Sequence, residues 1–73
     1  MSRVRVGADV TVTAEREDGV EIEGTIRLRP GQQIDLVTGR DVSAPARRAQ
    51  VWTWWVSRVG SDGIWFRGVC RWV

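Results

Sequence analysis

Apolar and polar residues alternate with a period of two along most of the chain, and this pattern limits the possible folds more than any other feature. Val10, Val12 and Ala14, for example, alternate with polar residues. Successive side chains of a β-strand point to opposite faces, so this pattern is typical of a strand with one buried face. No stretch shows an apolar helical stripe with a cap before it. The sequence therefore predicts an all-β fold without a helix longer than about two turns.

Turn residues divide this pattern into five expected strands. Asp18-Gly19 and the segment 60–63 tolerate positive φ angles and predict hairpin turns, and Pro30-Gly31 predicts another turn. The expected strands cover residues 9–14, 20–28, 33–37, 48–59 and 64–73. Residues 38–46 have no period and are expected to form the one long loop. Five strands in succession favour a meander that curls into a small antiparallel barrel or half-barrel.

The length of 73 residues allows one domain, over residues 1–73, with much of its surface in water. Hydrophobic residues make up 42% of the chain and charged residues 27%, which is a globular balance. The longest charge-free stretch, residues 49–57, is too short to cross a bilayer, and no secretory signal is visible. We therefore expect a cytoplasmic protein without a membrane partner. The single cysteine, Cys70, agrees with a reducing compartment and is expected to be buried and inert.

Side chains that titrate near neutral pH are scarce, because the chain has no histidine, lysine or tyrosine. Most acid–base mechanisms need such a group, so we expect no catalytic residues. Cys70 has no histidine or cysteine partner, and the carboxylates lack the spacing of metal ligands. The acids of residues 15–23 are instead expected to form the solvated face of a hairpin. The sequence thus predicts a protein that is not an enzyme and holds no metal or cofactor.

Five tryptophans are the chain's compositional peculiarity, and three of them lie in the strand expected over residues 48–59. Strict alternation places Trp52 and Trp54 on one face of this strand and Trp55 on the other. A small single-sheet barrel has only one interior, so one of these faces should be available to a partner or a second copy. The other tryptophans are expected to contribute to the core: Trp55, Trp65 and Trp72.

The arginines gather toward the C-terminus. Residues 1–26 hold three arginines against six acids, whereas residues 27–73 hold eight against three. Arg48 and Arg58 lie on the tryptophan-rich strand, and Arg67 and Arg71 share the outer face of the last expected strand. The candidate partner-binding residues are therefore Trp52, Trp54, Arg48, Arg58, Arg67 and Arg71.

Five segments occur in an order that is characteristic of one bacterial family. They are residues 10–12, 18–26, 28–36, 48–54 and 66–72. Their order resembles the strands of a PilZ domain, the small bacterial β-barrel that in many members binds cyclic di-GMP. The resemblance implies a PilZ-like barrel, and an SH3-like or Sm-like barrel is the alternative.

The ligand motifs of the PilZ family are missing. That family carries an RxxxR before the first strand and a [D/N]xSxxG after the second. Here Arg3 and Arg5 are spaced as RxR, and residues 24–30 contain no such serine motif. The resemblance therefore implies a degenerate member with a protein-binding or structural role.

Three functions follow from these observations. We expect a non-catalytic binding or regulatory module that contacts a protein partner or forms a homo-oligomer. The alternative is a nucleic-acid-binding barrel of the SH3-like, Sm-like or OB type, in which arginines hold phosphates and tryptophans stack on bases. The net charge of only +2 argues against it. Binding of cyclic di-GMP through non-motif arginines is a further alternative, against which the missing motifs argue.

Overall fold

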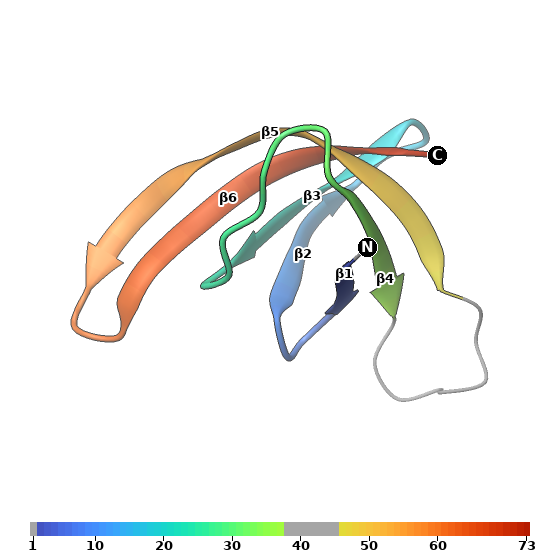
Figure 1. The fold of residues 1–73 in the computed structure, drawn as a ribbon. Coiled ribbons are helices and arrows are strands. Elements are labelled where there is room, and N and C mark those ends of the chain that lie inside the picture. Colours follow the sequence, from blue (N-terminus) through green and yellow to red (C-terminus); the bar gives the residue numbers. More distant parts are fainter. Residues whose placement is uncertain (1, 38–45) are drawn as a thin grey trace.

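The computed structural model describes residues 2–37 and 46–73, and within them it contains strands and no helix. The strands form a single curled sheet (Figure 1). Their bounds are β1 Ser2–Arg5, β2 Val10–Glu15, β3 Gly19–Gly24, β4 Gln33–Val37, β5 Arg47–Gly60 and β6 Gly63–Trp72. The predicted all-β class is confirmed. The long loop expected over residues 38–46 lies outside the described residues, apart from Ala46.

The strand order is β1-β4-β5-β6-β3-β2, which corrects the predicted meander of five antiparallel strands. The hairpins β2–β3 and β5–β6 are confirmed. However, β6 returns to pair with β3, and β1 pairs in parallel with β4. The strand β1 was not predicted because it has only four residues and its extended conformation depends on pairing with β4, a distant segment. The sheet is therefore mixed and has six strands among the described residues.

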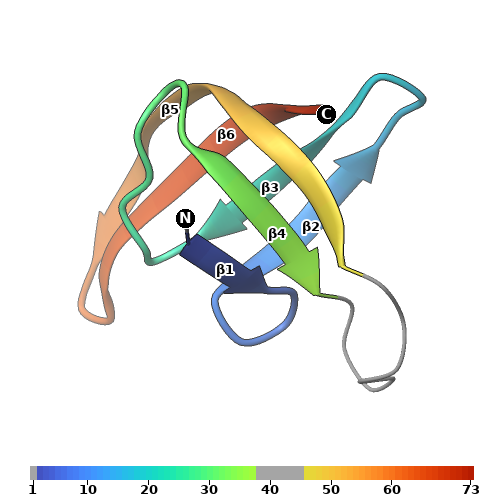
Figure 2. The same cartoon turned by 45° about the vertical axis from the view of Figure 1, so that its right-hand side comes forward.

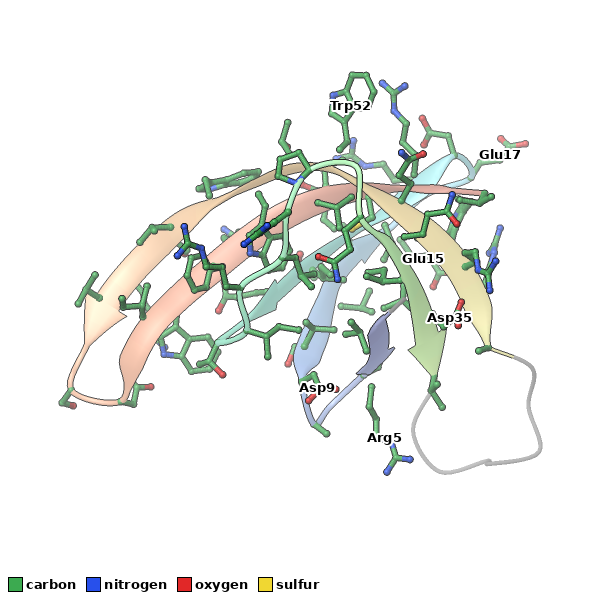
Figure 3. The ribbon with its side chains drawn as sticks, in the orientation of Figure 1. Arg5, Asp9, Glu15, Glu17, Asp35 and Trp52 are labelled. Atoms are coloured by element: carbon green, nitrogen blue, oxygen red, sulfur yellow. The ribbon has the colours of Figure 1, made fainter. Side chains whose placement is uncertain are left out.

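The sheet curls into a half-barrel whose two outermost strands are neighbours in the chain. A turn joins β1 to β2, and Val6 forms an isolated bridge to Val10 across it. The backbone N–H of Arg5 donates to the carboxylate of Asp9 at 2.9 Å, which fixes this turn. Figure 2 shows β1 close to the start of β2, and Figure 3 shows Arg5 and Asp9 at the turn between them. The curl therefore brings the two ends of the sheet together at this corner.

The core lies on the concave face of the half-barrel, and every strand contributes to it. Alternation explains the choice of residues, because each strand buries one of its two faces. The second expected strand corresponds to β3, which ends at Gly24, four residues earlier than expected, and Leu28 reaches the core from the following connection. The buried residues are Val4, Val10, Val20, Ile22, Leu28, Ile34, Leu36, Ala49, Val51 and Cys70.

The β5–β6 hairpin extends beyond the rest of the sheet (Figure 1). Its two strands pair with each other up to Gly60 and Gly63. By contrast, β4 pairs with β5 only as far as Gln50, and β3 pairs with β6 only from Phe66 onward. We call residues 53–65 the hairpin arm, and the rest of the described chain the body.

Candidate functional site

A β-bulge at Trp52 decides which tryptophan of β5 is exposed. Val51 lies opposite Cys70 and Thr53 lies opposite Val69, so Trp52 has no residue directly opposite. An extra residue of this kind shifts the alternation by one position. Val51 and Trp54 consequently both face the core. The prediction that Trp52 and Trp54 share a face is therefore wrong, because strict alternation does not continue through a bulge.

Trp54 is a packing residue of the concave face. Its half-buried ring packs against the core and stacks on Phe66, with 6.3 Å between ring centroids and 13° between ring planes. The ring lies across Gly68, the residue opposite in β6, where a Cβ atom would overlap it. Its Nε1 atom is buried without a hydrogen-bond partner among the described residues. The glycine thus provides the space in which Trp54 covers the end of the core.

Trp52 stands on the convex face, with 56% of its surface exposed. Figure 3 shows its side chain projecting away from the sheet. The guanidinium of Arg71 lies 3.7 Å from the centroid of its ring, a cation–π contact. Trp55, opposite Arg67, is also exposed, at 46%. The expectation that Trp55 contributes to the core is therefore wrong, again because the bulge exchanges the two faces.

The other two tryptophans are half-buried and hydrogen-bonded. Trp72 packs against the core, and its Nε1–H donates to the carbonyl oxygen of Arg16 at 3.1 Å. Trp65 donates its Nε1–H to the carboxylate of Asp62 at 2.8 Å, within the hairpin arm. Each ring also carries an arginine: Arg47 lies 3.8 Å from the Trp72 centroid and Arg58 lies 4.5 Å from that of Trp65.

The candidate arginines do not converge on one groove. Arg48 pairs with Asp35 at 3.0 Å and Arg58 pairs with Asp62 at 3.5 Å. The separation of ten positions between these two arginines corresponds to roughly 30 Å of strand. Of the six candidate residues, the structure brings together Trp52 and Arg71.

Arg67 lies on the same face of β6 as Arg71, and it pairs with Glu23 of β3 at 3.2 Å. Two exposed tryptophans and two arginines therefore share the convex side of β5 and β6. We call this surface the convex tryptophan face, which consists of Trp52, Trp55, Arg67 and Arg71.

A hollow of about 220 Å³ lies beside Trp52 and Arg71. Arg16 and Glu21 form an ion pair of 2.8 Å on its wall, and Asp18 is close to them. The sequence did not indicate Arg16 or Glu21 as site residues, because they come from the β2–β3 hairpin, far from the tryptophan-rich strand. Two basic and two acidic side chains line the hollow, so its charges balance.

Two ionisable groups of the described residues, Cys70 and Asp62, have a pKa that is shifted away from neutral pH. Burial raises the pKa of the Cys70 thiol to about 11, so the thiol is protonated and unreactive at neutral pH. The hydrogen bond from Trp65 is the largest influence on the pKa of Asp62 and lowers it, and a backbone hydrogen bond and the charge of Arg58 lower it further. No three histidine, cysteine or acidic side chains of the described residues are grouped as metal ligands. Residues 2–37 and 46–73 likewise contain no helix that is long and apolar enough to span a membrane.

Comparisons with protein-family models, with curated proteins and with solved structures gave no match. The function of the convex tryptophan face is therefore inferred from its own geometry.

Proposed function

We propose that the protein is a non-catalytic binding module, a degenerate PilZ-like domain that contacts a protein partner through the convex tryptophan face. The observation that carries this proposal is the exposure of Trp52, at 56%, and Trp55, at 46%, on one side of the sheet. Tryptophan and arginine are the residues most enriched among those that dominate binding energy at protein interfaces. Two of each occur on this face.

The charges of the face favour a protein over a nucleic acid. Arg67 is neutralised by Glu23, and the neighbouring Arg16 is neutralised by Glu21. Nucleic-acid binding depends on cationic side chains that are available to replace the counterions of phosphates. Arg71 is held over the ring of Trp52, which limits the freedom of both side chains. A partly ordered aromatic and guanidinium pair loses less conformational entropy when a partner binds.

The PilZ-like part of the proposal is supported by the order of the sequence segments and by the curled all-β sheet. The missing RxxxR and [D/N]xSxxG motifs support a protein partner in place of cyclic di-GMP.

A matched pair of variants tests the proposal. Proteins are first captured on immobilised wild type, Trp52→Ala and Val73→Ala. A captured protein is then purified, and its binding to each of the three is measured by calorimetry. We expect Trp52→Ala to weaken binding by about 2 kcal/mol or more, roughly 30-fold, with unfolding free energy changed by less than about 0.5 kcal/mol. Val73 is strongly exposed, at 72%, but lies outside the face, so its variant should bind normally. Equal binding by all three proteins would contradict the proposal.

Two ligand titrations separate the alternatives. Tryptophan fluorescence is recorded while cyclic di-GMP or a single-stranded oligonucleotide is added, because Trp52 and Trp55 are accessible to either ligand. We expect no saturable change with either one. Saturation by cyclic di-GMP at about micromolar concentration or below, or salt-sensitive saturation by the oligonucleotide, would replace the proposed function with the corresponding alternative.

A further inference from the structure

The hairpin arm has a long strand edge without a partner among the described residues. On the β4 side of β5, pairing ends at Gln50, and the last backbone hydrogen bonds join Val51 to Gly31 and Gln32, at 2.7 and 2.9 Å. The eight residues from Thr53 to Gly60 continue as strand and pair only with β6. Half of the backbone groups in such a segment point to the free edge and are available to another strand.

This edge lacks two of the usual protections against pairing. Exposed edge strands are commonly short, are interrupted by a β-bulge, or carry proline or several charged residues. The arm has one bulge, at Ser57 between Val56 and Arg58, and it pairs with β6 on both sides of it. Residues 53–60 contain no proline and a single charged residue, Arg58. Arg58 is paired with Asp62 and stacked on Trp65, so it does not extend from the edge as a free charge.

The concave face of the arm is apolar and exposed. Trp54 and Phe66 stack at its base, and Val56, Val59 and Ile64 continue the same face toward the tip. Their exposed fractions are 54% for Val56, 73% for Val59 and 49% for Ile64. An exposed apolar strip beside an unpaired strand edge is a typical docking surface for another strand.

We propose that the arm pairs with the arm of a second copy of this chain, β5 to β5 in antiparallel orientation about a two-fold axis. The inference rests on the proposed function in treating the protein as a binding module, but it uses the free edge and the concave face of the arm, not the convex tryptophan face. A strand that pairs antiparallel with its own copy forms an isologous contact, in which both edges are satisfied at once. The apolar strips of the two arms then lie side by side across the axis.

Charge favours a second copy over a charged partner. The arm contains one basic and one acidic residue, Arg58 and Asp62, and these form an ion pair of 3.5 Å. Two copies therefore approach each other without net repulsion, whereas an acidic protein or a nucleic acid meets no surplus of positive charge.

The size of the arm sets the expected strength of the dimer. A standard interface uses about 20–30 residues from each partner. The arm has 13 residues, numbers 53–65, so the dimer interface is smaller than the standard one. We expect a reversible dimer with a dissociation constant of roughly 1–100 μM.

Mass measurements on matched lysine variants test the proposal. Light scattering of the wild-type protein at about 300 μM should give a weight-average mass of about 1.7 to 2 times the 8.3 kDa of one chain. Val59→Lys places a charge on each side of the two-fold axis and should raise the dissociation constant more than about tenfold. Val73→Lys is the control, because Val73 is equally exposed, at 72% against 73%, but lies just after β6, at the end away from the arm. Val56→Lys serves as the second arm variant if Val59→Lys does not fold.

Hydrogen exchange distinguishes strand pairing from packing of apolar faces. Amides of residues 53–60 that point to the free edge should be protected at high but not at low protein concentration. The proposal is overturned by a wild type that stays monomeric, by arm variants that dimerise like Val73→Lys, or by a dimer without this protection. One outcome separates the two proposals. If the wild type is monomeric and Trp52→Ala still weakens binding of a protein partner, the dimer is overturned and the proposed function stands.

Discussion

The body and the hairpin arm both carry apolar side chains on the concave face of the sheet, but they bury them very differently. Ile22 and Ile34 of the body are fully buried, whereas Ile64 of the arm is 49% exposed. In the body, the curled sheet brings several strands around each apolar side chain. In the arm, β5 pairs only with β6, and beyond Trp54 the concave-face side chains of Val56, Val59 and Ile64 are 49–73% exposed. Burial therefore depends on how many strands surround a side chain, which alternation alone does not specify.

The largest expected effect comes from one substitution made in both regions. Ile34→Ala should lower the free energy of unfolding by about 2–5 kcal/mol, because it removes fully buried methyl groups and leaves a cavity. Ile64→Ala should lower it by less than about 1 kcal/mol, since half of that side chain is already in water. Urea unfolding of both variants measures the difference. Equal losses of unfolding free energy would show that Ile64 is buried to the same degree as Ile34, and would contradict the difference between arm and body.

The contact between arm and body is tested by Gly68→Ala. The added methyl group would overlap the ring of Trp54, which must then leave its position against the core. We expect a loss of up to about 3 kcal/mol in unfolding free energy, together with a change in tryptophan fluorescence. Ser57→Ala, an exposed site on the partner strand, is the control and should be nearly neutral. An unchanged free energy of unfolding in Gly68→Ala would mean that packing of Trp54 against the core does not stabilise the fold.

Burial in the body also predicts an alkaline loss of stability. The pKa of Cys70 is raised to about 11, so above the ordinary thiol pKa of 9.0 the unfolded chain releases a proton that the folded chain keeps. Stability should therefore fall as pH rises from about 9 to about 11, by on the order of 2 kcal/mol.

The chain offers an unusually clear control for this pH effect. It has no lysine or tyrosine, so Cys70 is the only side chain expected to titrate in that range. Unfolding free energies at pH 8, 9, 10 and 11, measured for wild type and Cys70→Ala, test the assignment. An equal decline in both proteins would rule out the thiol as its cause.

The smallest effects concern the surface ion pairs. A double-mutant cycle on Arg67 and Glu23, across β6 and β3 of the body, should give a coupling of about 0.2–1 kcal/mol that decreases with salt. The pair Arg58–Asp62 in the arm should couple more weakly, because both side chains are about half exposed. A stronger coupling in the arm would indicate that the arm is more ordered than its exposure suggests.

Several elements of the fold were predictable because they depend on local sequence. Asp18-Gly19 and the turn at residues 60–63 identified both hairpins, and alternation placed Cys70 on the buried face of β6. The exposed position of Trp52 was predicted as well, although for the wrong reason. Strict alternation assigned Trp52 and Trp54 to one face, and the bulge separates them. A bulge is a mismatch in residue number between two paired strands, so it cannot be recognised in one strand alone.

The sequence by itself determined the class of the fold, because a period-two pattern with turn residues between its segments allows only strands to bury the apolar side chains. It also determined the scarcity of titratable chemistry, since that follows from composition. The tertiary structure alone decided that β1 pairs with β4, that β6 pairs with β3, and that Trp52 and Arg71 meet on the convex face. These contacts join residues that are far apart in the chain, and their stability depends on the packing of the whole sheet rather than on any local preference.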